Sequence, residues 1–261
     1  MTVLKTFRAA FRLGCVLLLF LAAFLDFTFR LWLCGKARSI PARALWLKFW
    51  SRQFLRVLHL KVQFEGSLPT RGILASNHLS YVDILVLGSL HPLVFVSKSE
   101  VASWPVIGPL TRCAGTLYIV RREKSDVIRL GDEMTRVVNA GVVVSLFLEG
   151  TSSDGAQVLP FRSSLLAAAE EHHWPVTGAW IRYALSDGSV ADEVCYWRDM
   201  TFGPHLFNLL SKKNIEAVVS FGTPLTGHMD RKEMARELHA QVCGLRDAHF
   251  ARQEIGEPLA Y

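Results

Sequence analysis

The sequence lacks several features that would indicate a secreted, zinc-binding or serine-hydrolase protein. Its five cysteines lie far apart, form no Cys-x-x-Cys pair and have no histidine at zinc-finger spacing. No Gly-x-Ser-x-Gly nucleophile motif is present, which argues against an esterase or thioesterase. Internal repeats and low-complexity segments are also absent. We interpret the cysteines as reduced, buried thiols of a protein that faces a reducing compartment such as the cytoplasm.

The composition instead combines high hydrophobicity with a basic charge balance. Of 261 residues 51% are hydrophobic and 20% are charged, with a net charge of +6 at pH 7. The length suits one sizeable core with an appendage. The hydrophobicity suggests membrane contact, and a basic protein is attracted either to nucleic acid or to an anionic membrane surface. The position of the basic residues decides between these two partners.

The N-terminal segment carries the longest apolar run. Residues 13–25 are all apolar or small, and Asp26 and Arg30 interrupt the extension to Leu33 that would reach membrane-spanning length. Their four-residue spacing allows the two to pair. Basic residues flank both ends about equally, so the positive-inside rule gives no orientation. This symmetry fits a helix that enters and leaves on one membrane face, and no small-x-small site indicates cleavage of a signal peptide.

Residues 41–60 predict a second, amphipathic helix. Lys48, Arg52 and Arg56 recur at four-residue spacing and form one basic stripe among apolar and aromatic residues. We predict a membrane-surface helix, with a core helix that has a solvated basic face as the alternative. The predicted domains are therefore a membrane-associated pair of helices at 1–60 and a catalytic domain at 61–261. Because the basic stripe adjoins the apolar run, a nucleic-acid partner is disfavoured.

Beyond residue 60, short apolar runs alternate with helical patterns, which predicts an α/β fold. The clearest helices are expected at 124–140, which ends before Gly141, and from Asp230, where Glu233 completes a capping-box pattern. A hairpin turn is expected at 186–189, between the expected strands 176–184 and 190–196. The expected strands are 62–65, 73–76, 94–97, 116–120, 142–148, 176–184, 190–196 and 216–221.

One strand-to-helix turn carries a reactive combination, Asn77-His78-Leu79-Ser80-Tyr81-Val82-Asp83. An imidazole has a suitable pKa range to take the proton of a hydroxyl as it attacks a thioester. Asp83 could orient the ring of His78, as in a triad whose serine is replaced by the acceptor's own hydroxyl. The bare His-x4-Asp spacing is weak on its own, because about a third of a match is expected by chance in this composition.

Further motifs follow in a fixed order: Gly115 to Arg121 (GTLYIVR), Phe147 to Ser152 (FLEGTS) and Trp174 to Ile181 (WPVTGAWI). Together with the Asn-His-x-Ser-x-x-Asp motif, this set resembles the PlsC-like glycerolipid acyltransferase family, typified by lysophosphatidic acid acyltransferases. The resemblance covers roughly residues 70–185 and the N-terminal pair of helices. It implies a mixed central sheet flanked by helices, on the cytoplasmic face of the inner membrane, as a monotopic or single-pass protein.

The resemblance also implies an activity and roles for individual residues. The reaction would transfer a fatty acyl chain from acyl-CoA or acyl-acyl-carrier protein to a lysolipid hydroxyl, by default that of 1-acyl-glycerol-3-phosphate, giving phosphatidic acid. His78 would be the general base and Asp83 its partner, with no metal, no bound cofactor and no acyl-enzyme. The residues expected to bind the substrate are Asn77, Ser80, Arg121, Glu149, Gly150 and Thr151.

This sequence departs from the family pattern at two positions of one motif. The family usually has Phe-Pro-Glu-Gly-Thr-Arg, whereas Leu148 and Ser152 stand here at the proline and arginine positions. That arginine is associated with the phosphate of the acceptor. The continuation from Ser153 to Leu165 resembles the branch that acylates lyso-ornithine lipid, and Arg162 could supply the missing charge.

Three questions stay open at the level of the sequence. Glu149 could bind an acceptor hydroxyl or brace the loop from beneath, since a carboxylate that leaves a buried strand needs partners in either case. For the thioester oxyanion, backbone N–H groups near Asn77 are our hypothesis. A non-enzymatic membrane-surface protein is the alternative of another class, although it would give no reason for the His78 motif.

Overall fold

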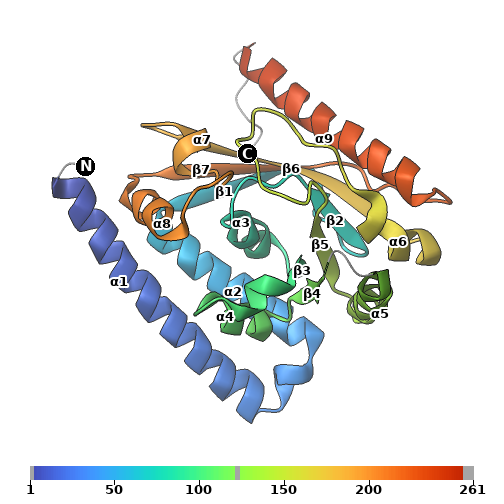
Figure 1. Cartoon of the computed structure of the whole chain (residues 1–261), viewed down its shortest axis with the longest axis horizontal. Coiled ribbons are helices and arrows are strands. Elements are labelled where there is room, and N and C mark those ends of the chain that lie inside the picture. Colours follow the sequence, from blue (N-terminus) through green and yellow to red (C-terminus); the bar gives the residue numbers. More distant parts are fainter. Residues whose placement is uncertain (1–2, 121–123, 255–261) are drawn as a thin grey trace.

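A mixed β-sheet forms the centre of the fold, in a computed structural model that describes residues 3–120 and 124–254. Within these residues the strand order is β1-β7-β6-β2-β5-β3-β4 (Figure 1). Every neighbouring pair is parallel except β6 and β7, which are antiparallel. The predicted mixed sheet is confirmed. The strands are β1 (Leu60–Glu65), β2 (Ile73–Ser76), β3 (Leu93–Lys98), β4 (Leu117–Ile119), β5 (Val143–Phe147), β6 (Val176–Leu185) and β7 (Ile215–Phe221).

Helices cover both faces of this sheet (Figure 1). One face carries α1 (Val3–Asp26), α2 (Ile40–Leu58), α3 (Asp83–Leu90), α4 (Ile107–Ala114) and α8 (Phe202–Ser211). The other face carries α5 (Lys124–Asn139), α6 (Ala167–His172) and α9 (Arg231–Glu254). Five short elements connect them: η1 (Phe27–Leu33, a π-helix), η2 (Lys36–Arg38), η3 (Ser99–Ser103), η4 (Ser163–Leu166) and α7 (Val190–Glu193).

The central strands are buried on both sides, which explains their sequences. All four residues of β2 and the first four of β5 are buried. A parallel strand covered by helices on both faces has no solvated side, so it reads as a continuous apolar run and not as an alternation. These two strands end side by side, with Ser76 paired to Phe147. The chain segments that follow them, from Asn77 and from Leu148, therefore start at the same edge of the sheet.

One predicted strand is wrong. Residues 190–193 form the short helix α7, and no strand includes residues 194–196. The hydroxyl of Ser189 accepts a hydrogen bond from the backbone N–H of Asp192 at 3.3 Å, as at a helix N-terminus, and two acidic residues follow in the first turn. The turn at 186–189 therefore does not join a hairpin, and β6 pairs instead with β7.

The N-terminal helix α1 is fixed to the rest of the protein along its length. The guanidinium of Arg12, which is 6% exposed, donates to the carbonyls of Leu210 and Lys212 at the end of α8 (3.1 and 2.5 Å). Arg8 donates to the carbonyl of Ser211 at 2.9 Å. These carbonyls belong to the last turn of a helix, where they have no partner within the helix. Two arginines of an apolar helix thus cap another helix.

The opposite end of α1 is fixed as well. Asp26 pairs with Arg30 at 2.7 Å, as their spacing predicted, and also accepts a hydrogen bond from the indole N–H of Trp50 at 3.0 Å. The remaining surface of α1 and η1 is apolar and exposed, at Val3, Leu4, Phe7, Phe11, Leu17, Leu18, Leu21, Phe24, Leu25, Phe29, Trp32 and Leu33. The helix from Val3 to Leu33 is long and apolar enough to cross a membrane, and only 17% of its most apolar window is buried. This exposed apolar surface indicates membrane association.

The second helix, α2, is more buried than predicted. Trp46, Trp50, Phe54 and Leu58 are each at most 9% exposed, and the Phe54 ring lies 4.9 Å from that of Phe20 in α1. The core-helix alternative therefore describes its aromatic face. Its basic stripe keeps to the surface, where Arg52 donates to the carbonyl of Ser89 at 2.9 Å. The exposed large hydrophobic side chains of α2 are Leu45 and Phe49.

All five cysteines are free thiols. Cys113 and Cys195 are buried, as predicted, but Cys34 is exposed and Cys15 and Cys243 are half-buried. The prediction of five buried thiols is therefore wrong for three of them. Cys34 is exposed because it follows η1 at the turn between the two N-terminal helices, where apolar side chains are not covered by protein.

Candidate active site

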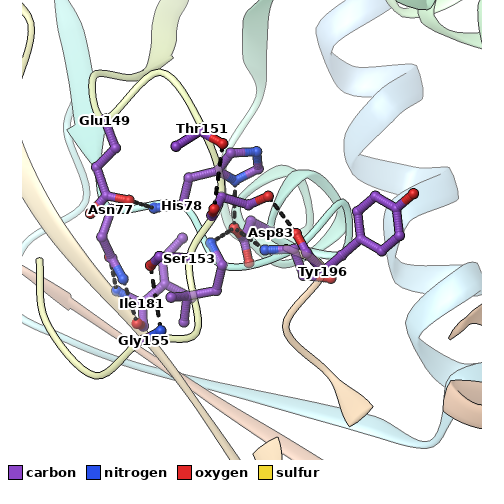
Figure 2. A network of polar contacts seen from close by, with 12 residues as sticks. Asn77, His78, Asp83, Glu149, Thr151, Ser153, Gly155, Ile181 and Tyr196 are labelled. Carbon is purple, nitrogen blue, oxygen red and sulfur yellow. Dashed lines mark hydrogen bonds and ion pairs between the residues drawn. The ribbon is translucent and has the colours of Figure 1, made fainter. Parts of the chain in front are cut away.

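The loop after β2 holds His78 and Asp83 in direct contact. Asp83 is the first residue of α3 and is completely buried. Its Oδ2 lies 2.8 Å from Nδ1 of His78 (Figure 2). Because a carboxylate oxygen can only accept, Nδ1 carries the proton, and the lone pair of the ring lies on Nε2. His78 is thereby held in the tautomer that can accept a proton at Nε2, while 22% of its side chain stays exposed.

Asp83 accepts three further hydrogen bonds. The backbone N–H groups of Leu79 and Ser80 donate to Oδ2 at 2.7 and 3.0 Å. The phenol of Tyr183 on β6 donates to Oδ1 at 2.6 Å, and Tyr183 is 3% exposed. Burial, followed by the charge of Asp83, raises the pKa of Tyr183 far above its usual range, so the phenol stays a donor.

Tyr183 was not predicted from the sequence. It lies 100 residues from Asp83 and reaches it because β6 pairs with β2. The signal that could have found it is the phenol itself, because a tyrosine in a largely buried strand needs a hydrogen-bond partner. The sequence alone does not say which partner.

The ring of His78 is also held by stacking. Its centroid lies 4.0 Å from that of Phe147, at an interplanar angle of 18°. Phe147 ends β5 and in turn stacks on Phe95 of β3 at 6.1 Å. The imidazole is therefore fixed by a carboxylate at one nitrogen and by an aromatic face on one side.

Glu149 is buried and joins two loop segments through hydrogen bonds. Its Oε2 accepts the backbone N–H of His78 at 3.2 Å (Figure 2). Its Oε1 accepts the backbone N–H of Leu159 at 3.0 Å. The residue is 3% exposed. Burial raises the pKa of Glu149 to about 7, and the two N–H donors offset only part of this effect. Of the two roles considered for Glu149, the geometry favours bracing.

Asn77 and Ser80 are both buried. The side chain of Asn77 forms two hydrogen bonds with the backbone of Ile181, at 2.7 and 3.0 Å, and so ties the end of β2 to β6. The hydroxyl of Ser80 is buried without a polar partner among the described residues, and the contact of Ser80 with the site is its N–H to Asp83. Their predicted role in substrate binding stays a prediction.

The turn that follows Glu149 brings Arg162 to the site. Gly150 has a φ of +77°, and a Cβ built there would lie 3.0 Å from Nε of Arg162. The guanidinium therefore packs directly over Gly150, a position where a side chain would collide with it. Thr151 is exposed, and its hydroxyl lies 3.5 Å from the carbonyl of Ser152. Arg121, predicted to bind a phosphate, lies outside the described residues.

Ser152 has a structural partner. Its hydroxyl donates to the carbonyl of Tyr196, whose N–H donates to the carbonyl of Leu79 at 2.8 Å (Figure 2). Ser153 is tied in the same way, since its N–H donates to the carbonyl of His78 at 3.0 Å. The segments around residues 79, 152 and 196 are therefore joined by hydrogen bonds beside His78.

The hypothesis for the oxyanion is wrong for the N–H groups of His78, Leu79 and Ser80. Each of the three already donates to a carboxylate, of Glu149 for the first and of Asp83 for the other two. An N–H that serves a buried carboxylate is not available to a transient charge on the substrate. These three N–H groups thus hold the two carboxylates, and the hypothesis stays a prediction for the other N–H groups near Asn77.

Cys195, whose thiol is affected by the charge of Asp83, is not suited to act as a nucleophile. Burial raises the pKa of the Cys195 thiol to about 12, and the neighbouring charge of Asp83 adds to this effect. A thiol of that pKa is a poor nucleophile at neutral pH. In residues 3–120 and 124–254 no group of three His, Cys, Asp or Glu side chains could hold a metal ion.

Comparison with known proteins identifies the family of this chain. Residues 59–182 match the acyltransferase family. A lyso-ornithine lipid O-acyltransferase of Brucella abortus is 32% identical over 84% of this chain and 92% of that protein. One of Rhodobacter capsulatus is 36% identical over 71% of this chain and 70% of that protein. The chain belongs to the acyltransferase family.

The fold of this acyltransferase agrees with a solved structure. The lysophosphatidic acid acyltransferase PlsC of Thermotoga maritima matches with a TM-score of 0.61 over 91% of this chain and 98% of that one, at 18% identity. A 1-acyl-sn-glycerol-3-phosphate acyltransferase of Neisseria gonorrhoeae is 29% identical over 59% of the chain. The protein is an acyltransferase that acts on lysolipids, and the non-enzymatic alternative is set aside.

Proposed function

We propose that this acyltransferase transfers a fatty acyl chain from a thioester, acyl-CoA or acyl-acyl-carrier protein, to the hydroxyl of lyso-ornithine lipid, with His78 as general base. The contact between His78 and Asp83 carries the chemical part of this proposal, because it leaves Nε2 as the proton acceptor. The position of Ser152 and the named relatives carry the choice of acceptor.

In the proposed reaction, Nε2 of His78 removes the proton of the acceptor hydroxyl as its oxygen attacks the thioester carbonyl. A carbon–oxygen bond forms, the carbon–sulfur bond breaks, and the imidazolium returns the proton to the departing thiolate. Asp83 stabilises the imidazolium through Nδ1, as the carboxylate of a catalytic triad does. The stack on Phe147 keeps the ring at one orientation, so little reorientation is needed between the two proton transfers.

The acceptor site supports an acceptor without a phosphate. The family's arginine at position 152 is associated with the acceptor's phosphate, and here Ser152 is bound to the backbone of Tyr196 instead. Ornithine is an amino acid, so its lipid offers a carboxylate and an amine in place of a phosphate. Arg162 over Gly150 places a guanidinium beside the same turn, suited to a carboxylate.

The N-terminal helix supports a monotopic arrangement on the cytoplasmic face. Lys5 pairs with Asp187 at 3.1 Å, Arg8 and Arg12 cap α8, and Asp26 bonds to Trp50. If α1 crossed the bilayer, these parts of the catalytic domain would have to enter it with α1. A helix that lies in the interface, with its exposed apolar side chains toward lipid, keeps all these contacts. The free thiols fit a reducing compartment.

Lysophosphatidic acid is the second candidate acceptor, because a relative from Neisseria gonorrhoeae carries that name. The deciding experiment measures acyl transfer by the purified full chain in detergent, from acyl-CoA and from acyl-acyl-carrier protein, to each acceptor separately. We expect lyso-ornithine lipid to be the better acceptor by about tenfold or more in kcat/KM. His78→Ala should abolish transfer to both, while the protein stays folded.

Ser152→Arg sharpens this test. An arginine at this position should improve transfer to lysophosphatidic acid by about tenfold relative to lyso-ornithine lipid, since a charged hydrogen bond contributes about 1.5–3 kcal/mol. Ser164→Arg, at an exposed position in η4, adds the same charge outside this turn and should leave the ratio unchanged. Equal or faster transfer to lysophosphatidic acid by the unmodified enzyme would overturn the proposed acceptor in favour of the second.

A further inference from the structure

A cavity of about 680 Å³ lies between the start of α2, the end of α4 and one side of α5. Five arginines line it, Arg38, Arg43, Arg112, Arg129 and Arg136, together with the single acidic residue Glu133. Its remaining lining is largely apolar, including Ile40, Leu117 and Val137. Arginines beside apolar side chains, the latter called the floor of the cavity below, suit an amphipathic anion.

Most of this positive charge has no carboxylate partner among the residues that the structure describes. Arg129 is paired with Asp126 and Glu133, at 2.6 and 2.7 Å. Arg43 donates to the carbonyls of Arg112 and Cys113 at the end of α4. In residues 3–120 and 124–254, by contrast, no carboxylate lies within 4.0 Å of the guanidinium groups of Arg38, Arg112 and Arg136. Three arginines therefore line one cavity without a carboxylate partner in the described part of the chain.

The cavity is separate from the reacting centre. Val94 of β3 lines it and lies level with Ile73 of β2, because both pair with Val144. Ser76, which leads to His78, is three residues further along β2, or about 10 Å. Two more strand spacings separate β2 from β3 across the sheet. The arginines thus lie toward the opposite ends of the parallel strands and do not contact the acyl-transfer site.

The cavity is, however, next to the exposed apolar turn between α1 and α2. Phe29, Trp32 and Leu33 are each more than 60% exposed at this turn, and Arg38 follows Leu33 by five residues. Figure 1 shows this turn at the end of the long N-terminal helix, with the start of α2 leading from it toward α4. A surface that places these apolar side chains in a bilayer brings Arg38 and the cavity to the level of the lipid head groups.

We propose that this cavity binds the head group of an anionic phospholipid and fixes the orientation of the enzyme on the membrane. The phosphate pairs with Arg38, Arg112 and Arg136, while the first carbons of the lipid contact the apolar floor at Ile40 and Leu117. The exposed apolar turn lies in the bilayer beside it. This site is independent of the identity of the acyl acceptor.

The test compares binding of the full-length protein to two kinds of vesicle, of phosphatidylcholine alone and of phosphatidylcholine with a quarter phosphatidylglycerol. The variant Arg38→Gln/Arg136→Gln removes two of the unpaired charges. Arg231→Gln/Arg236→Gln removes two exposed arginines of α9, neither of which lines the cavity, and is the matched control. Acyl transfer in detergent, measured on all three proteins, reports whether the catalytic site stays intact.

We expect the cavity variant to lose about tenfold or more of its binding to the anionic vesicles and to keep its binding to pure phosphatidylcholine. The control variant should bind both as the unmodified protein does. An equal loss in the two double variants would overturn the proposal, because it would show attraction of the whole basic surface. Unchanged binding of the cavity variant would also overturn it.

Soluble glycerol phosphate distinguishes the lipid from a free anion. We expect it to compete weakly, because it lacks the apolar part that contacts the cavity floor. If it raises the thermal midpoint of the unmodified protein but not that of Arg38→Gln/Arg136→Gln, while vesicle binding does not depend on anionic lipid, then the cavity binds a small free anion and the lipid proposal fails.

Discussion

Two carboxylates are buried in the same site, and they are held in different ways. Asp83 accepts four hydrogen bonds, two from side chains and two from backbone N–H groups. Glu149 accepts two, both from the backbone, and burial raises its pKa to about 7. The two carboxylates therefore differ in the number of their donors: Asp83 is positioned against His78 by four, whereas Glu149 joins two loop segments through two.

The largest effect is expected for Asp83→Asn, which should lower kcat by about 10³–10⁴-fold. Asparagine offers one accepting oxygen to the four donors that surround Asp83, where the carboxylate offers two. It can present either its carbonyl or its NH₂ to Nδ1 of His78, so the tautomer of His78 would no longer be fixed. The measurement is single-turnover acyl transfer with the thermal midpoint as a check on folding. If the folded variant keeps more than about a tenth of the activity, Asp83 does not act through His78.

Glu149→Gln should change the pH dependence of stability. The pKa of Glu149 rises from its usual 4.5 to about 7 on folding, so between these pH values the folded state binds more protons than the unfolded state. The free energy of unfolding of the unmodified protein therefore falls as pH rises through this window, by about 3 kcal/mol in total. The glutamine variant has no such titration, so its stability relative to the unmodified protein should rise from pH ~4.5 to pH ~7.

The appropriate readout for Glu149 is the difference in thermal midpoint between the two proteins across this pH range. Glu133→Gln, at a half-buried position on α5 outside the site, is the control for loss of one carboxylate. A constant difference at all pH values would mean that Glu149 is ionised in the same way in both states, and the contrast with Asp83 would disappear.

Tyr183→Phe should reduce kcat by about tenfold and leave KM nearly unchanged. It removes a hydrogen bond to a charged group without changing the shape of the core, a loss of about 1.5–3 kcal/mol at most. With one donor fewer, the carboxylate of Asp83 is held less firmly against Nδ1 of His78, so the loss should appear in kcat and not in KM.

Tyr118→Phe is the matched control for this change. The phenol of Tyr118 is half-buried and bonds to the hydroxyl of Thr111 at 2.7 Å, at the other end of the sheet. It should leave kcat and KM unchanged. If Tyr183→Phe lowers the thermal midpoint but leaves kcat unchanged, Tyr183 has a structural role only.

The local part of the site could be predicted from sequence, and the long-range part could not. His78 and Asp83 lie in one turn, so their spacing alone brings the side chains together, and the motif names both. Glu149 could be assigned to the site, but its role depended on which N–H groups faced it. Tyr183 needed the pairing of β6 with β2, which a run of apolar residues does not specify.

The same division applies to the fold. Strands β2 and β5 were predicted almost to the residue, because continuous apolar runs bounded by turns describe strands buried on both faces. Residues 190–196 alternate weakly, and the cap at Ser189 decided for a helix. For α2, the same amphipathic pattern fits a membrane or a protein neighbour, and only the contacts with α1 and α3 distinguish the two.

The contacts of Arg8 and Arg12 with α8 bear on how this enzyme can be handled. A truncation that removes the apolar helix to gain solubility would also remove the caps of α8 and expose the aromatic face of α2 that Phe20 covers. The shortened protein would lose the exposed apolar surface of α1 but expose the aromatic face of α2, and it would lose part of its scaffold. The hydrophobic helix is therefore part of the folded domain as well as its membrane-associated surface, so a protein prepared for purification should retain it.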